Sequence, residues 1–377
     1  MIKIDPCFLD NWYAGNFQKA IKGRYITAQY IDPILTRFGQ PFKVVHLGYS
    51  HLGKPIHKIE FGQGSHKVLI WSQMHGNEST GTKAMFDLLN FIEKPGDLKD
   101  VRDSIMENCQ IHFIPILNPD GAELYTRLSA QKIDLNRDAV DLLAPESQIL
   151  NQELQHVNPR FCFNLHDQRT IFSVGPDNKP ATLSFLAPST EVDRKITESR
   201  KITMSVISGI KSLLDHFIPD QLGRYTDEFY PTATGDNFQK AGYPTVLIES
   251  GHYPNDYDRE ISRKYTFYSI LQGLNSIANG VKHLSYHDYF SIPENEQNLF
   301  DIVLRGVQFK GEITDIGVQL KEELKNTTIK FEPTIVITGD LSKYSSNIAL
   351  EKADTTKLKF NSEKNVLMYI IDNLPIQ

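Results

Sequence analysis

The stretch HKVLIWSQMHGNESTGTKAMFDLLNFIEK, His66 to Lys94, carries the signals of a strand, a polar turn and a helix in succession. The run HKVLIW is short and apolar, as expected of a strand buried on both faces. After the turn, Ala84, Leu88 and Ile92 recur at four-residue spacing and a Pro-Gly pair follows, which predicts a helix ending near Lys94. Buried strands that alternate with helices indicate an α/β domain.

Three further apolar runs extend this pattern along the chain: QIHFIPILN, RFCFNLHD and PTVLIES. We predict a helix in APESQILNQELQHV and a short one between residues 15 and 40. The fold class expected is α/β, with a mixed, largely parallel central sheet flanked by helices. We assign residues 1–295 to this domain.

The tail, residues 296–377, has a different character. FDIVLRGVQF, ITDIGVQL, TTIKFEPTIVITG and KLKFNSEKNVLMYIIDN read as short strands, and only LKEELKN has a helical pattern. We therefore predict a small C-terminal all-β module, to which the sequence assigns no chemistry.

Composition narrows the classes of partner. The 40 basic and 46 acidic residues give a formal charge of −6, and no block of Lys or Arg would bind a phosphate backbone, so we expect no nucleic acid partner. No run of 18 apolar residues predicts a membrane span, and no secretion signal is seen at the start. The three cysteines are too few for a disulfide framework, so we expect reduced thiols and a cytoplasmic location.

Polar residues follow each of the four apolar runs: His75 and Glu78, then residues 118–120, then His166 and finally Glu249. In open α/β sheets, ligands bind beyond the carboxyl ends of the strands. His-x-x-Glu supplies two zinc ligands from one turn, and a distant third ligand would complete a catalytic site. Each piece alone also fits a surface turn or a hydrogen-bonded core histidine, so the combination carries the prediction.

At this point the chain resembles the zinc carboxypeptidases of the carboxypeptidase A type, the M14 metallopeptidases. The matching pieces, in chain order, are HGNE, NPDGAELYTR followed by DLNRD, His166, and YPTATGDNFQKAGYPTVLIES, and they span roughly residues 40–290.

The resemblance implies that His75, Glu78 and His166 bind one zinc ion. Asp134 would accept the other ring N–H of His75, and Glu249 would be the general base. From the residues alone, Asp134 could equally be a solvated loop carboxylate, and Glu249 a strand-end partner of an arginine.

The same resemblance assigns substrate contacts. Arg127 would stabilise the oxyanion, and Asn136 with Arg137 would hold a terminal carboxylate. Tyr230 would close over that carboxylate, with Tyr225 as a competing candidate. Surface salt bridges remain the alternative for both arginines, and simple packing remains the alternative for either tyrosine.

Three aspartates depart from or complicate the family pattern: Asp138, Asp167 and Asp236. The charge of Asp138 and Asp167 predicts a pocket for a cationic or polar group, and Asp236 lies in the loop where such enzymes set side-chain preference, with its role left open. We also expect Gly76 and Asn77 to let the chain turn sharply between the two ligands.

The function expected is a zinc metallocarboxypeptidase acting on short peptides, or peptide-like substrates, with a free carboxylate. One alternative is an N-acyl amino acid deacylase of the succinylglutamate desuccinylase and aspartoacylase type, which shares the H-G-N-E element. Another is a non-catalytic peptide-binding relative. Side-chain preference, the role of the tail and the oligomeric state are left open by the sequence.

Overall fold

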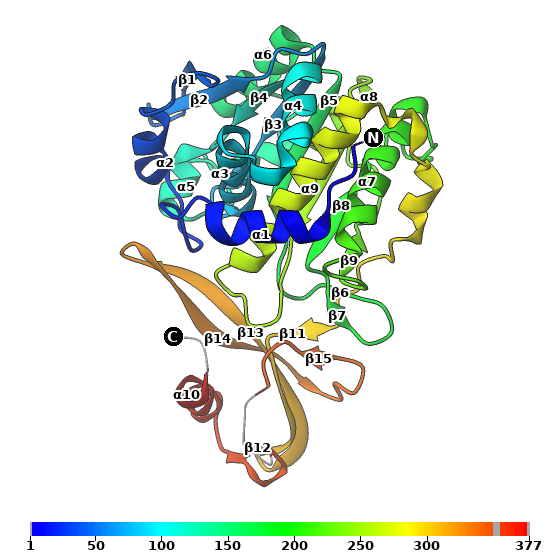
Figure 1. Ribbon diagram of the computed structural model, residues 1–377. Helices are drawn as coiled ribbons and strands as arrows, with labels where there is room; N and C mark the ends of the chain where they lie inside the picture. The colour runs from blue at the N-terminus through cyan, green and yellow to red at the C-terminus, as the bar shows by residue number, and fades with distance from the viewer. Residues whose placement is uncertain (1, 350–354, 375–377) are drawn as a thin grey trace.

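A computed structural model describes residues 2–349 and 355–374 (Figure 1). A large α/β domain lies above a smaller C-terminal module (Figure 1). The chain enters the module where the colour changes from yellow to orange (Figure 1). Within the described residues, no helix has the length and apolar character needed to cross a bilayer.

The large sheet has eight strands in the order β1-β2-β4-β3-β5-β10-β8-β9. The four middle strands β4, β3, β5 and β10 are parallel to one another, whereas β1, β2 and β8 pair antiparallel with a neighbour. The predicted mixed, largely parallel sheet is therefore confirmed. The strands are β1 (Lys43–Tyr49), β2 (Pro55–Phe61), β3 (His66–Trp71), β4 (Cys109–Ile114), β5 (Phe161–Asp167), β8 (Leu183–Leu186), β9 (Leu222–Arg224) and β10 (Thr245–Ser250).

Helices cover both faces of this sheet. Successive side chains of β3 from Val68 to Trp71 point to opposite faces and both faces are buried, so each of these positions favours an apolar residue. Val68 and Ile70 belong to the larger core, under α1, α3, α4, α7 and α9, whereas Leu69 and Trp71 belong to a second core with α6 and α8. The helices are α1 (Pro6–Asn16), α2 (Ala28–Leu35), α3 (Thr80–Glu93), α4 (Lys99–Asn108), α5 (Pro119–Leu124), α6 (Pro145–Val157), α7 (Glu198–Leu214), α8 (Thr234–Lys240) and α9 (Glu260–Asn279).

Short elements complete this part of the chain. A two-stranded ribbon and four 3-10 turns lie between the larger elements: β6 (Ser173–Val174), β7 (Lys179–Pro180), η1 (Gly96–Leu98), η2 (Leu135–Arg137), η3 (Val281–His283) and η4 (Tyr286–Ser291). The η2 turn matters most for function, because the predicted site residues Asn136 and Arg137 lie in it.

The C-terminal module has its own four-stranded sheet, in the order β14-β13-β12-β16, and a small apolar core. Its elements are β11 (Leu299–Phe300), β12 (Ile302–Phe309), β13 (Glu312–Lys325), β14 (Thr328–Gly339), β15 (Ser345–Ser346), η5 (Thr355–Lys357), β16 (Lys359–Phe360) and α10 (Glu363–Asn373).

Two local predictions in the tail were wrong. LKEELK continues β13 instead of forming a helix, because it pairs residue by residue with β14. Residues 363–373, expected as strand, form α10, in which Val366 and Ile370, four residues apart, are buried in the module core. The described part of the module therefore contains a β-sheet, as predicted, together with the helix α10.

Backbone pairing continues through the predicted boundary at residues 295 and 296. Glu294 bridges to Arg224, and Glu296 bridges to Ser173. The module is thus joined to the large domain by main-chain hydrogen bonds as well as by the covalent chain.

Candidate metal centre

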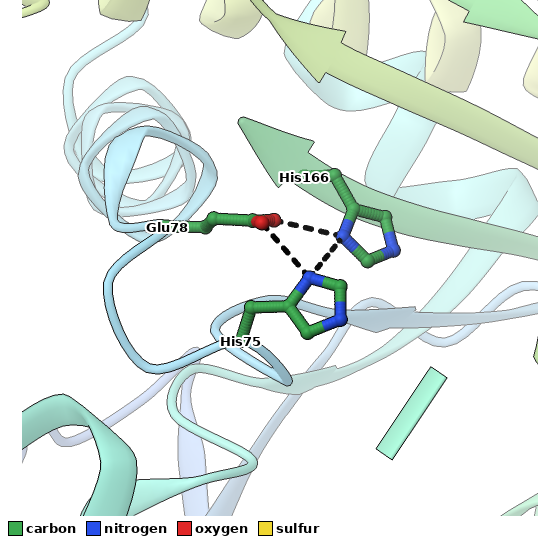
Figure 2. Close-up of side chains that lie close together, drawn as sticks. All are labelled: His75, Glu78 and His166. Carbon is green, nitrogen blue, oxygen red and sulfur yellow. Dashed lines mark hydrogen bonds and ion pairs between the residues drawn. The ribbon is translucent and has the colours of Figure 1, made fainter. Parts of the chain in front are cut away.

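Three side chains predicted as metal ligands converge at the carboxyl edge of the large sheet (Figure 2). His75 and Glu78 lie in the turn between β3 and α3, and His166 lies near the end of β5, the neighbouring parallel strand. All three are buried, and one ligand atom from each lies within 4.8 Å of the others.

The atoms that face one another are two imidazole nitrogens and a carboxylate. His75 Nδ1 lies 2.9 Å from Glu78 Oε1, and His166 Nδ1 lies 2.9 Å from Glu78 Oε2. The two Nδ1 atoms are 3.1 Å apart. Two histidines and one carboxylate form a donor set that catalytic zinc sites use.

The protonation of His75 shows that this arrangement fits a cation. Its Nε2 lies 3.0 Å from Asp134 Oδ1, and an ionised carboxylate only accepts hydrogen bonds, so Nε2 carries the proton. In a neutral ring, the lone pair of Nδ1 then faces the Glu78 carboxylate. These two electron-rich atoms need a positive charge between them.

The electrostatics of the cluster agree with that requirement. Burial by itself would lower the pKa of His75, but the charge of Glu78 and the hydrogen bond with Asp134 raise it above its ordinary value. Burial opposes ionisation of Glu78 as well, yet the two histidines hold its pKa well below its ordinary value. The cluster therefore attracts positive charge at the meeting point of its ligand atoms.

The ligand turn is held by close backbone packing. A Cβ atom on Gly76 would lie 2.0 Å from the carbonyl carbon of Gly121, so no larger residue fits there. Gly76 itself is not left-handed, and the left-handed residue of this loop is Gln73, at φ 44°. The Gln73 side chain secures that conformation by donating to the carbonyl of Gly76 at 2.9 Å.

The residues of the NPDG segment support the turn. Asn118 caps α5 by accepting from Gly121 N at 2.8 Å, and its amide donates to the carbonyl of Met74 at 3.2 Å. Asp120 accepts from Ser50 Oγ at 2.9 Å. This segment therefore forms a base on which the ligand turn rests.

Glu249 lies beside His166. The strands β10 and β5 are parallel neighbours in which Glu249 pairs with His166, so the two side chains point to the same face of the sheet. Burial and then the negative charges of Glu78 and Asp167 raise the pKa of Glu249 well above its ordinary value, although the residue keeps some exposure to solvent. A carboxyl group with a raised pKa next to a metal site is suited to proton transfer.

Arg127 also reaches the ligand cluster. Its Nη1 lies 3.2 Å from His75 Nδ1 and 3.3 Å from Glu78 Oε1, and its Nε donates to Asp134 at 3.0 Å. The side chain is 44% exposed, so a ligand that approaches from solvent can reach it. The surface salt bridge considered from sequence is thus present, and it adjoins the candidate site.

Asn136 and Arg137 lie in the same turn as Asp134, whose carboxylate accepts from the backbone N–H of Asn136 at 2.9 Å. Asn136 Oδ1 accepts from Thr234 N at 3.2 Å, which joins this turn to the start of α8. The guanidinium of Arg137 lies 5.1 Å from the ring centre of Tyr230. The residues predicted to bind a carboxylate therefore form one group next to the ligands.

The two candidate tyrosines occupy different places. Tyr230 is 45% exposed and contacts Arg137. Tyr225 follows β9, and burial, with the charges of Glu249 and Glu78, raises its pKa. Tyr225 is therefore within electrostatic reach of two carboxylates of the candidate site.

The carboxylates of the three aspartates have hydrogen-bond partners within the protein. Asp138 accepts from Leu143 N at 2.9 Å and from Ala144 N at 2.8 Å. The other two carboxylates also have internal partners, Asp167 with Thr80 Oγ1 at 2.7 Å and Asp236 with Tyr230 N at 3.1 Å. The cationic or polar preference expected from Asp138 and Asp167 stays a prediction.

Comparison with known proteins shows the fold and a similarity to one enzyme family. The zinc carboxypeptidase family model matches residues 27–200, a range that includes all three candidate ligands and ends before Glu249. A probable carboxypeptidase 2 of Arthroderma benhamiae is 29% identical over 133 residues, which are 34% of this chain and 24% of that protein. This chain thus spans about a quarter of the length of that relative.

Two solved structures have the same fold. A putative carboxypeptidase from Burkholderia mallei superimposes with a TM-score of 0.52 at 16% identity, covering 67% of each chain. Carboxypeptidase A from Helicoverpa armigera superimposes with a TM-score of 0.54 at 16% identity, covering 73% of this chain and 80% of that one. These similarities show that the domain holding His75, Glu78 and His166 has the fold of the solved carboxypeptidases, and that residues 27–200 are similar to the zinc carboxypeptidase family.

Proposed function

We propose that this protein is a metallocarboxypeptidase that binds one zinc ion at His75, Glu78 and His166 and hydrolyses the C-terminal bond of short peptides. The observation that carries the proposal is the pairing of Glu249 with His166 on adjacent strands, at the edge where Glu78 and His75 meet. A zinc ion bound there would lower the pKa of a coordinated water and polarise the scissile carbonyl.

The reaction needs a proton carrier, and Glu249 meets the requirements. Its raised pKa lets it take a proton from the attacking water and give that proton to the leaving amine. Asp134 keeps the proton of His75 on Nε2, so that Nδ1 is the atom available for the metal.

The positive groups account for a substrate with a free carboxylate. Arg127 is placed to balance the negative charge that develops on the carbonyl oxygen. Arg137, held beside Tyr230 in the turn after Asp134, can bind the terminal carboxylate through its two parallel N–H groups. Peptides are the substrate class that the family implies.

The test compares the wild-type protein with Glu249→Gln, which keeps the shape of the side chain and removes its ability to carry the proton. We expect both proteins to hold about one zinc per chain by elemental analysis. The variant should lose at least about 100-fold in kcat on an N-blocked dipeptide, as general acid–base catalysis contributes on this scale. Glu191→Gln, at an exposed position, is the matched control and should keep its activity.

Substrate controls separate the alternatives. The wild-type protein should cleave a peptide with a free C-terminus much faster than the same peptide with a C-terminal amide. Faster hydrolysis of N-acyl amino acids than of peptides would favour a deacylase and contradict the carboxypeptidase. A protein without zinc, and inactive after zinc addition, would contradict catalysis altogether.

A cytoplasmic location is a further part of the proposal. Its support is the presence of Cys7, Cys109 and Cys162 as free thiols. Fractionation of the source cells, with the protein detected by antibody, tests it, and recovery outside the cytoplasm would overturn it.

A further inference from the structure

The C-terminal module adjoins the carboxyl edge of the large sheet, where the metal centre lies. Thr170, four residues after His166, is within 3.3 Å of Gln319 of β13, and its carbonyl accepts from Asn347 at 3.0 Å. The backbone N–H of Leu299 donates to the carbonyl of Ile171 at 3.3 Å. Figure 1 shows β13 and β14 running beneath the large domain on this side.

Glu322 of the module contacts two residues of the large domain near the ligand cluster. The Glu322 carboxylate on β13 lies 2.8 Å from Arg24 Nη2 and accepts from the Tyr125 hydroxyl at 2.5 Å. The Arg24 side chain is 5% exposed, and that of Glu322 is 24% exposed. Solvent therefore screens this ion pair less than it screens an exposed pair.

Tyr125 connects Glu322 to the arginine of the site. It ends α5 in a left-handed conformation, at φ 53°, which residues other than glycine rarely adopt without support. Thr126 N then donates to the carbonyl of Gly121 at 2.9 Å, and Arg127 follows directly. The direction in which Arg127 leaves the helix thus depends on the residue whose hydroxyl Glu322 holds.

Arg24 connects Glu322 to the ligand turn. Its carbonyl accepts from Ser79 Oγ at 2.6 Å, and Ser79 is the neighbour of Glu78. Its guanidinium also donates to the carbonyl of Tyr257 at 3.3 Å. The Glu322 carboxylate therefore contacts Tyr125, which precedes Arg127 by two residues, and Arg24, which is hydrogen-bonded to the ligand turn through Ser79.

We propose that Glu322 is a positioning residue of the catalytic site, through which the C-terminal module holds Arg127 and the turn of Glu78 in their working places. This inference deepens the proposed function and rests on it for its kinetic consequence. Its structural consequence, local order in the Arg127 segment, can be measured without any activity.

The variant Glu322→Gln tests the proposal, with Glu323→Gln as the matched control. Glu323 is the next residue of the same strand, and it pairs with Lys321 at the surface. Hydrogen exchange of the metal-free protein should speed up in Glu322→Gln within residues 119–137 and around Ser79, and stay unchanged elsewhere. The control should exchange like the wild-type protein.

Kinetics give the second measurement. In the zinc-loaded protein, Glu322→Gln should lower kcat about tenfold, with a smaller change in KM, as the loss of an outer partner of a metal site does. Tyr125→Phe keeps the ion pair and removes only the hydroxyl, so it should reproduce most of the kcat loss. Combining the two variants should add little, because both weaken the same contact between residue 322 and Tyr125.

The outcomes separate this proposal from the proposed function. Faster local exchange in a protein whose wild type has no peptidase activity would keep the positioning role and reject the activity. A wild-type peptidase whose Glu322→Gln and Tyr125→Phe variants keep both kcat and local exchange would reject the positioning role. Faster exchange throughout the module and the domain alike would show that Glu322 only stabilises the interface, which also rejects it.

Discussion

The carboxyl group of Asp236, at the start of α8, has a pKa raised to about 6 because the protein buries it. Its hydrogen bond from Tyr230 N and the charge of Arg137 oppose this shift without cancelling it. Because the folded-state pKa exceeds the ordinary value of 3.8, the group stabilises the fold fully below that value. The contribution is lost as the pH rises through about 6.

Asp236→Asn should therefore stabilise the protein at neutral pH. The amide keeps an acceptor for Tyr230 and carries no charge, so the free energy of unfolding at pH 7 should rise by up to about 3 kcal/mol. At pH 4 the variant and the wild type should differ little. Urea unfolding at both pH values measures the difference, with the exposed Asp141→Asn as control. A gain that does not depend on pH would show that burial of the charge is not its cause.

Residues of the metal centre differ in how well the sequence alone predicts them. His75, Glu78 and His166 follow strands whose apolar runs are unmistakable, so their meeting at one edge follows from strand order. For Tyr225 and Tyr230 the sequence offers no such guide. Loop conformation decides which one approaches Glu249, and that conformation depends on contacts with distant residues such as Arg137.

The ligand turn and α5 are two elements in direct backbone contact, with Gly76 packed against Gly121. Gly76→Ala should force them apart and lower the free energy of unfolding by at least about 1–3 kcal/mol, the usual cost of overpacking. Zinc affinity should fall with it, because His75 is the neighbouring residue.

Gly15→Ala is the control, since a Cβ there meets nothing within 4 Å and the residue lies in α1. Its stability should stay the same or rise by up to about 1 kcal/mol, because alanine is the better helix former. Urea unfolding and zinc titration measure both effects. A Gly76→Ala variant as stable as the control would contradict this, because it would show that the ligand turn and α5 can move apart at no cost.

The helices α9 and α10 are two elements that hydrophobic periodicity in the sequence does not predict. Nearly every residue of α9 is buried, polar ones such as Thr266 and Asn275 among them, so it has no apolar stripe to recognise. In α10 a continuous apolar run resembles a strand, yet Val366 and Ile370 are buried in the module core and Tyr369 packs against it, at helical spacing. Tertiary packing overrides local preference in both helices.

Across the whole molecule, a buried ion pair joins three separate segments. Arg263 of α9 donates from Nε and Nη2 to Asp87 of α3, each at 2.7 Å, and neither side chain is exposed. The same guanidinium donates to the carbonyls of Ile21 and Gln18 at 2.7 Å. It thereby fixes the N-terminal segment against the two helices.

Asp87→Ala should remove the two-oxygen partner of buried Arg263, which keeps its ion pair with Glu260 at 3.0 Å, and destabilise the protein by up to about 3–5 kcal/mol. Asp103→Ala removes an exposed partner of Lys99 and should change stability by less than about 0.5 kcal/mol. Thermal and urea unfolding of the two variants provide the comparison. Equal stabilities would mean that the interior reorganises around Arg263 at little cost.

The sequence by itself determined the elements whose signals are local: the buried strands β3, β4, β5 and β10, the helices α3 and α6, and the three candidate ligands placed at strand ends. Only the tertiary structure decided which residues from outside these units approach the metal centre. Arg127 contacts His75 and Glu78 from a loop, and Glu322, 244 residues beyond Glu78 (322 minus 78), contacts Arg24 and Tyr125 from a second module. Strand periodicity depends on neighbouring residues, whereas a contact between distant segments depends on how the whole chain packs.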